Sequence, residues 1–211
     1  MEKTDGKNAP PQKGGNGLSR RGFLKGAGLT TVGSVALQHG LLGKDVENAP
    51  ADNTLGPGPV RIQLKVNGRT RNAHVEPRDT LAKTLRDHLK LTGTKVVCDR
   101  GSCSACTVWL DGTPVNSCMT MALDAVGKEI TTIEGLETDG NLHPVQEAFI
   151  EHDASMCGFC TPGMVMSAAH LVNNHPNPTL EDVKNATRGN LCRCGTHPNV
   201  FKATLAAAKA K

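Results

Sequence analysis

The chain has 211 residues, a net charge of +4 and an aromatic content of only 2%. This length allows one or two domains, each with its own hydrophobic core. Residues 1–51 account for +3 of the charge, and the nearly neutral remainder excludes the basic stripe with stacking aromatic side chains that nucleic-acid binding requires. Because aromatic residues are scarce, aliphatic packing must hold the domains together, with bound cofactors as a candidate second contribution.

Residues 1–51 are predicted to be an export leader. Ser19-Arg20-Arg21-Gly22-Phe23-Leu24-Lys25 precedes a weakly apolar run from Gly26 to Leu42, which is the pattern of a twin-arginine (Tat) signal. The run is too short and too polar for a stable membrane span of about 20 residues. We therefore expect a periplasmic protein without a stable membrane span, with a charged turn before a short helix as the alternative interpretation. Residues 52–59, rich in Gly and Pro, are the expected linker.

Residues 60–136 carry the pattern of a β-grasp domain. Val60–Val66 alternates apolar and polar residues, and Asn67-Gly68 suits a type I′ turn into a second strand over Thr70–Val75. An amphipathic helix is expected over 80–89, because one face is made by Leu81, Leu85 and Leu89. Three short strands should follow at Thr107–Leu110, Thr113–Val115 and Lys128–Ile133.

Within this domain the cysteines follow the spacing of a plant-type ferredoxin. Cys98, Cys103 and Cys106 are separated by four and by two residues, and Cys118 follows in a separate segment. Three thiolates on one tight loop with a distant fourth are the ligand set of a [2Fe-2S] cluster. Small residues allow the backbone to bend so that its N–H groups point at the sulfurs: Gly101, Ser102, Ser104 and Ala105.

Residues 137–211 change from strands to helices. Helices are expected over 142–153, after Pro162, from Thr179 and from Pro198. The fold class is therefore α+β: an N-terminal β-grasp (plant-type ferredoxin-like) domain is followed by a small four-helix-bundle [2Fe-2S]-binding domain. The methionines are expected to be core side chains: Met119, Met121, Met164 and Met166.

A second cysteine set lies in the helical part and uses every remaining cysteine: Cys157, Cys160, Cys192 and Cys194. Two sets of four indicate two [2Fe-2S] clusters. Zinc is the alternative for four thiolates, although the one-residue gap in Cys192-Arg-Cys194 is shorter than the usual zinc spacing of about two to four. A thioredoxin-type pair would leave Cys192 and Cys194 unused. A disulfide scaffold is a further alternative for an exported chain. Twin-arginine export, however, carries proteins that are already folded around their cofactors, and cysteines bound to metal before export are not available for disulfide pairing.

Three cysteine strings together resemble the iron-sulfur subunit of the molybdenum hydroxylases, the xanthine dehydrogenase and aldehyde oxidoreductase family. They are Cys98-Asp-Arg-Gly-Ser-Cys103-Ser-Ala-Cys106-Thr-Val108, Cys157-Gly-Phe-Cys160-Thr-Pro-Gly163 and Gly189-Asn-Leu-Cys192-Arg-Cys194. The resemblance covers residues 60–208. With the export signal, the layout is most similar to the small subunit of bacterial periplasmic aldehyde oxidoreductases, which favours aldehydes over purines as substrate by analogy.

The resemblance implies an electron-transfer subunit of a molybdenum-dependent oxidoreductase, with the substrate chemistry on another subunit and no catalytic residue in this chain. The helical-domain cluster would lie next to a molybdopterin held by a large partner subunit. The first cluster would pass single electrons to FAD on a medium subunit or to another acceptor. Cys194 is implied to contact the molybdopterin. Met156 stands where the family often has a pterin-binding Gln, and Ser104 where Gly is commoner.

Two other functions fit the same residues. A stand-alone exported two-cluster electron carrier would use the eight cysteines without a molybdenum partner. Such a carrier needs an exposed centre, whereas the family buries the helical-domain cluster. A zinc-stabilised exported structural protein would be colourless and would contain zinc without iron.

Overall fold

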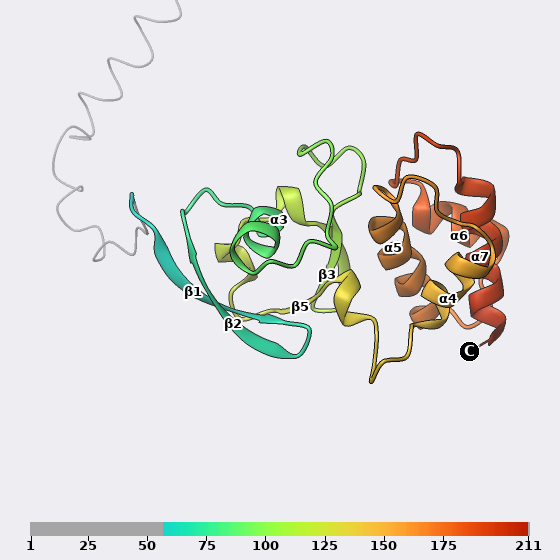
Figure 1. Ribbon diagram of the computed structural model, residues 1–211, viewed down its shortest axis with the longest axis horizontal. Helices are drawn as coiled ribbons and strands as arrows, with labels where there is room; N and C mark the ends of the chain where they lie inside the picture. The colour runs from blue at the N-terminus through green and yellow to red at the C-terminus, as the bar shows by residue number, and fades with distance from the viewer. Residues whose placement is uncertain (1–56, 211) are drawn as a thin grey trace, which may run out of the picture. The chain divides into compact units, whose positions relative to one another are not determined.

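The computed structural model describes residues 57–210, so the expected leader and most of the expected linker lie outside the described residues. The first element is a hairpin of strands β1 (Val60–Val66) and β2 (Arg69–Val75), which pair antiparallel (Figure 1). Asn67 and Gly68 between them have φ angles of 52° and 70°. A type I′ turn needs positive φ at both central residues, and the predicted hairpin is confirmed.

Within residues 57–210, five strands form one mixed sheet in the order β2-β1-β5-β3-β4. β3 (Thr107–Leu110) and β4 (Thr113–Asn116) form a second antiparallel hairpin. β5 (Glu129–Thr131) lies between the two hairpins, parallel to β1 and antiparallel to β3. Short 3-10 helices lie at Ser117–Met119 (η2), Leu123–Ala125 (η3) and Ile133–Gly135 (η4). The buried side chains of β1 pack with the helix that follows β2, which gives the sheet one covered face.

This helix, predicted over 80–89, is not a continuous α-helix. It begins as α3 (Leu81–Lys83) and continues as the π-helix η1 (Thr84–His88). The Leu89 N–H donates to the Thr84 carbonyl five residues earlier, at 3.0 Å, and the Thr84 hydroxyl shares the Thr80 carbonyl with its own N–H. Such side-chain bonding competes with regular helical winding. The predicted amphipathic helix is present and its apolar face is buried as expected, and its second part is π-helical.

Asp79, just before α3, is a buried carboxylate with several donors. Only 3% of it is exposed. It accepts from Lys83 Nζ at 2.6 Å and from the Glu76 N–H at 2.9 Å, and His88 Nε2 lies 3.4 Å away. Burial acts to raise the pKa of Asp79, but the hydrogen bonds and the positive charges of Lys83 and His88 outweigh it and hold this pKa below its usual value of 3.8. The ionised carboxylate therefore stabilises the folded chain, and this contribution is lost as the pH falls through the folded pKa.

The substitution Asp79→Asn is expected to lower the free energy of unfolding at neutral pH by about 1–2 kcal/mol, because the Glu76 N–H and the Lys83 ammonium lose a charged acceptor. The loss should persist above about pH 5, where the carboxyl is ionised in folded and unfolded chains, and should shrink below about pH 4. Urea unfolding followed by circular dichroism measures it. Asp87→Asn, an exposed change in η1, is the control. A loss that does not shrink as the pH falls below about 4 would contradict the assignment.

Within residues 137–210, four α-helices make up the second part of the fold: α4 (Pro144–Glu151), α5 (Thr161–Asn174), α6 (Leu180–Thr187) and α7 (His197–Ala210). Local signals set their starts. Proline occupies the first turn of α4 and of α5, where its missing N–H costs nothing. Thr179 and Asp182 form a capping box at the start of α6. The four predicted helices are confirmed.

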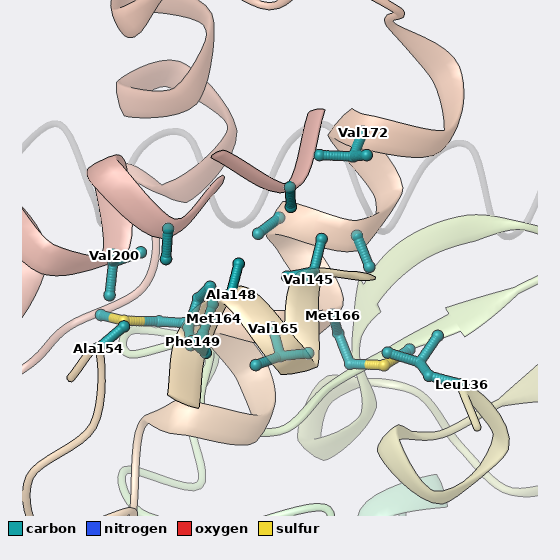
Figure 2. Close-up of a cluster of buried hydrophobic side chains, with 14 residues drawn as sticks. Leu136, Val145, Ala148, Phe149, Ala154, Met164, Val165, Met166, Val172 and Val200 are labelled. Atoms are coloured by element: carbon teal, nitrogen blue, oxygen red, sulfur yellow. The ribbon is translucent and has the colours of Figure 1, made fainter. Parts of the chain in front are cut away.

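The helical core is filled by aliphatic and methionine side chains around Phe149 of α4. Met164 of α5 extends toward Val200 of α7, and Met166 points toward Leu136 (Figure 2). Both methionines are fully buried, as predicted. The helical core therefore includes Leu136, which lies in the segment that connects the sheet to α4.

Trp109 of β3 joins the sheet to the helices. Its indole Nε1 donates to the Met166 carbonyl of α5 at 3.0 Å. Its ring meets the His170 ring edge-on, with centroids 6.1 Å apart. In Figure 1, β3 is the labelled strand next to α5. None of the helices in residues 57–210 has both the length and the apolar character that a membrane crossing requires.

Candidate iron-sulfur sites

The four cysteines of the first set meet beside the sheet. Cys98, Cys103 and Cys106 lie on the loop between η1 and β3, here named loop 98–106, and Cys118 lies in η2. The Cys98 thiol interacts electrostatically with that of Cys103, and the Cys106 thiol with that of Cys118. All four are free thiols. Cys98 is half-buried and the other three are buried.

Loop 98–106 is held in a tight turn by its backbone. Asp99, Gly101 and Ser104 have φ angles of 51°, 71° and 51°. The Gly101 N–H donates to Cys118 Sγ at 3.3 Å, and its carbonyl accepts from Asn116 Nδ2 at 3.2 Å. The bend predicted from the small residues is thus present, and a backbone N–H points at a sulfur.

The surroundings stabilise the thiolate form of Cys98 and destabilise that of Cys118. The Arg100 N–H, the Cys103 thiol and further backbone N–H groups lower the pKa of Cys98 to about 7. Burial raises the pKa of Cys118 to about 11, although the Gly101 N–H acts in the opposite direction. Buried thiolates are unfavourable unless a cationic centre compensates their charge. The donor set therefore suits iron, which replaces the thiol protons when it binds.

The second set is assembled at the starts of two helices. Cys157 and Cys160 precede α5, and Cys192 and Cys194 lie on the segment before α7, here named loop 189–194. The thiol of Cys157 interacts electrostatically with that of Cys194, and the thiol of Cys160 with that of Cys192. Cys157 is exposed and the other three are half-buried.

In each pair of this set, one thiolate is stabilised and its partner is not. Burial acts to raise the pKa of Cys192, but hydrogen bonds from the Thr196 hydroxyl, at 3.1 Å, and from other donors lower it to about 6. Burial raises the pKa of its partner Cys160 to about 12. The Phe159 N–H lowers the pKa of Cys157, and the contact with Cys157 raises the pKa of Cys194.

Both sets fit a [2Fe-2S] cluster through their pairing. In each set the thiols interact electrostatically as two neighbouring pairs. A [2Fe-2S] cluster has two irons, each bound by two protein ligands, so one pair can serve each iron. In the described part of the chain, no group of three or more His, Cys, Asp or Glu side chains is arranged to hold one metal ion.

The structure brings all eight cysteines together in the two sets that the spacing indicated. The expectation that Met119 lies in the core is wrong: it is 64% exposed, because η2 carries it to the surface beside loop 98–106. Sequence reasoning missed Asn190, Gly163 and Thr196, which contact the cysteine loops. Gly163 and Asn190 stand inside the strings that carry the family resemblance, but no contact role was predicted for them, and Thr196 had no signal beyond its proximity to Cys194.

Comparisons with known proteins agree with this geometry. Residues 64–130 match the 2Fe-2S iron-sulfur cluster binding domain, and residues 132–205 match the [2Fe-2S] binding domain. The chain is 39% identical over 201 residues to the aldehyde oxidoreductase iron-sulfur-binding subunit PaoA of Escherichia coli K12, covering 88% of this chain and 86% of PaoA. It is 49% identical over 146 residues to the nicotine 6-hydroxylase small subunit of Paenarthrobacter nicotinovorans, covering 69% of this chain and 88% of that subunit.

Solved structures share the fold. Quinoline 2-oxidoreductase from Pseudomonas putida 86 contains a chain that is 41% identical, with a TM-score of 0.69 over 72% of this chain and 95% of that one. Aldehyde oxidoreductase from Desulfovibrio gigas is 40% identical, with a TM-score of 0.67 over 72% of this chain and 17% of that one. In the second protein the homologous region is one part of a longer chain.

The fold and the two sites define a two-centre iron-sulfur protein, with a ferredoxin-like domain followed by a helical [2Fe-2S]-binding domain. The chain belongs to the iron-sulfur subunits of the molybdenum hydroxylase family, the family of aldehyde oxidoreductases and xanthine dehydrogenases. It is an electron-transfer subunit with two [2Fe-2S] clusters in a molybdenum-dependent oxidoreductase. Complexes of this family carry molybdopterin and FAD on partner subunits. The resemblance and the fold class predicted from the sequence are confirmed.

Proposed function

We propose that this chain relays single electrons from a molybdopterin centre on a large partner subunit to FAD on a medium subunit or to another acceptor. The relay uses first the cluster on Cys157, Cys160, Cys192 and Cys194, and then the cluster on Cys98, Cys103, Cys106 and Cys118. The cluster that receives the electrons first belongs to a helical domain of residues 137–211. The cluster that receives them second belongs to a ferredoxin-like domain of residues 60–136. The observation that carries the proposal is the pairing of the eight thiols into two sites for two irons each.

The helical-domain cluster is proposed to face the molybdenum subunit. Three apolar side chains beside its cysteines are more than half exposed: Met156, Phe159 and Leu191. Exposed apolar side chains gathered in this way are typical of a surface that a partner covers. Cys194 is the proposed molybdopterin contact. Met156 lacks a hydrogen-bond donor, so its contribution at this position is apolar contact rather than hydrogen bonding to the pterin.

Aldehydes are the proposed substrate class of the complex. The match to the aldehyde oxidoreductase subunit PaoA covers 88% of this chain, so it reaches into the residues before 57. The matches to subunits named for nicotine, nicotinate and caffeine oxidation cover 67–71%. The longer match to PaoA supports an aldehyde substrate by analogy with that subunit.

Export by the Tat pathway to the periplasm is proposed from the twin arginines. Replacing Arg20 and Arg21 together by lysine is expected to abolish the appearance of the iron-containing chain in the periplasmic fraction, because the pathway recognises the arginine pair rather than its charge. Immunoblots of periplasm and cytoplasm measure the distribution. Lys13→Arg, which also preserves charge, is the control. Export of the double-lysine variant at the wild-type level would contradict the assignment.

The relay is tested by purifying the chain with its co-expressed partner subunits. We expect molybdenum and FAD in the complex, and two distinct [2Fe-2S] EPR signals that both appear when an aldehyde is added. A monomer that transfers electrons without a molybdenum subunit would identify a stand-alone carrier instead. A colourless preparation with zinc and no iron would identify a structural protein.

A further inference from the structure

The two cysteine loops are joined by a backbone hydrogen bond. The Leu191 N–H of loop 189–194 donates to the Cys103 carbonyl of loop 98–106 at 3.1 Å. Cys103 is a proposed ligand of the first cluster, and Leu191 is covalently bonded to Cys192, a proposed ligand of the second. A single hydrogen bond therefore links the two ligand sets. On each side of this bond, covalent bonds alone lead to a proposed cluster ligand, Cys103 or Cys192.

Asn190, the residue before Leu191, is anchored in three directions around this bond. It is only 2% exposed. Its side-chain Nδ2 donates at 3.0 Å to the carbonyl of Ser104, the residue that follows Cys103 in the chain. Its own N–H donates to the Thr187 carbonyl at the end of α6, at 2.9 Å, and its carbonyl accepts from His197 Nε2 at the start of α7, at 3.0 Å. Asn190 thus connects the helices to loop 98–106.

The Ser104 carbonyl is held in place to receive this amide. Ser104 has a φ of 51°, and its carbonyl also accepts from the Thr107 hydroxyl at 2.7 Å and the Thr107 N–H at 3.3 Å. Gly163 of α5 lies against the same group, since a Cβ there would come within 2.2 Å of the Ser104 oxygen. No side chain fits between α5 and loop 98–106, so backbone contact and the Asn190 amide set the approach of the loops.

We propose that Asn190 is a positioning residue for electron transfer between the two clusters. Its amide maintains the Cys103–Leu191 hydrogen bond and thereby the spacing and the bonded path between the centres. In the step, one electron leaves the helical-domain cluster, which is oxidised, and enters the first cluster, which is reduced. No bond breaks and no proton moves at Asn190. Tunnelling weakens steeply with distance and is more efficient along bonded atoms than across a gap. The proposal rests on the proposed relay function.

The test replaces the amide without changing its shape. Asn190→Asp puts an oxygen in place of Nδ2, and an ionised carboxylate cannot donate to the Ser104 carbonyl. In the assembled complex reduced with dithionite, EPR measures the magnetic splitting between the two reduced clusters, and hydrogen exchange measures protection of the Leu191 amide. We expect a smaller splitting and faster exchange, with the g values of the individual clusters unchanged; the midpoint potentials are compared in Asn190→Ala, which adds no charge.

Asn199→Asp is the matched control. The Asn199 Nδ2 donates to the Asp153 carbonyl at 3.2 Å, away from loop 98–106, so the same substitution there should leave the splitting unchanged. Unchanged splitting and exchange in Asn190→Asp would overturn the proposal. If that variant does not retain both clusters, Asn190→Ala, which adds no charge, is measured in the same way. Unchanged splitting in it, or loss of a cluster in both variants, would also overturn the proposal, because Asn190 would then act only in assembly. A wild-type complex without two [2Fe-2S] signals would instead contradict the relay itself.

Discussion

Exchange of Cys160 for serine is expected to abolish one of the two [2Fe-2S] EPR signals and to leave the other intact, and Cys106→Ser is expected to do the reverse. Each variant removes one member of a different thiol pair. A serine hydroxyl is a hard, poorly ionised donor that does not replace a thiolate on iron. Iron content should fall from about four to about two atoms per chain.

Electron flow should stop completely in the Cys160→Ser complex, because the proposed relay enters this chain through the helical-domain cluster. Iron analysis, EPR of the dithionite-reduced chain and aldehyde-dependent reduction of an external acceptor measure these effects. Ser102→Ala, an exposed change inside loop 98–106, is the control and should keep both signals. Wild-type signals in either cysteine variant would refute that cysteine as a ligand.

The substitution Gly163→Ala is expected to have the largest effect on folding. The added Cβ would lie 2.2 Å from the Ser104 carbonyl oxygen and 3.0 Å from the backbone of Ala105. Neither neighbour can rotate away, so α5 and loop 98–106 must separate. We expect a loss of about 2–3 kcal/mol in the free energy of unfolding, as overpacking of a closed contact costs. Alanine stabilises a helix by about 1 kcal/mol relative to glycine. A net loss in the free energy of unfolding therefore comes from the clash of the added Cβ.

Urea unfolding measured by circular dichroism gives this free energy. Gly189→Ala is the graded control, because a Cβ at Gly189 would meet the Ser104 hydroxyl at 3.1 Å, and that side chain can rotate. Its loss should be clearly smaller. Equal stability of Gly163→Ala and the wild type would show that α5 and loop 98–106 are not closely packed at this point.

Local signals predicted most of the elements correctly. Asn67 and Gly68 adopt the positive φ angles that the predicted hairpin turn needs. The leucines at 81, 85 and 89 are buried as their spacing indicated. The spacing of the leucines did not indicate the π-helical winding of η1. The position of Met119 was missed because an apolar residue type does not by itself decide between a buried and an exposed position.

The sequence by itself determined the chemistry of this protein. Eight cysteines in two spaced sets specify two iron-sulfur sites, because ligand type and loop bending are local properties. Only the tertiary structure decided which thiols pair, Cys106 with Cys118 and Cys160 with Cys192. It also decided that the two loops touch through Asn190 and Ser104, which are 86 positions apart. Contacts of this kind arise from the packing of α5 against β3, and no local pattern encodes them.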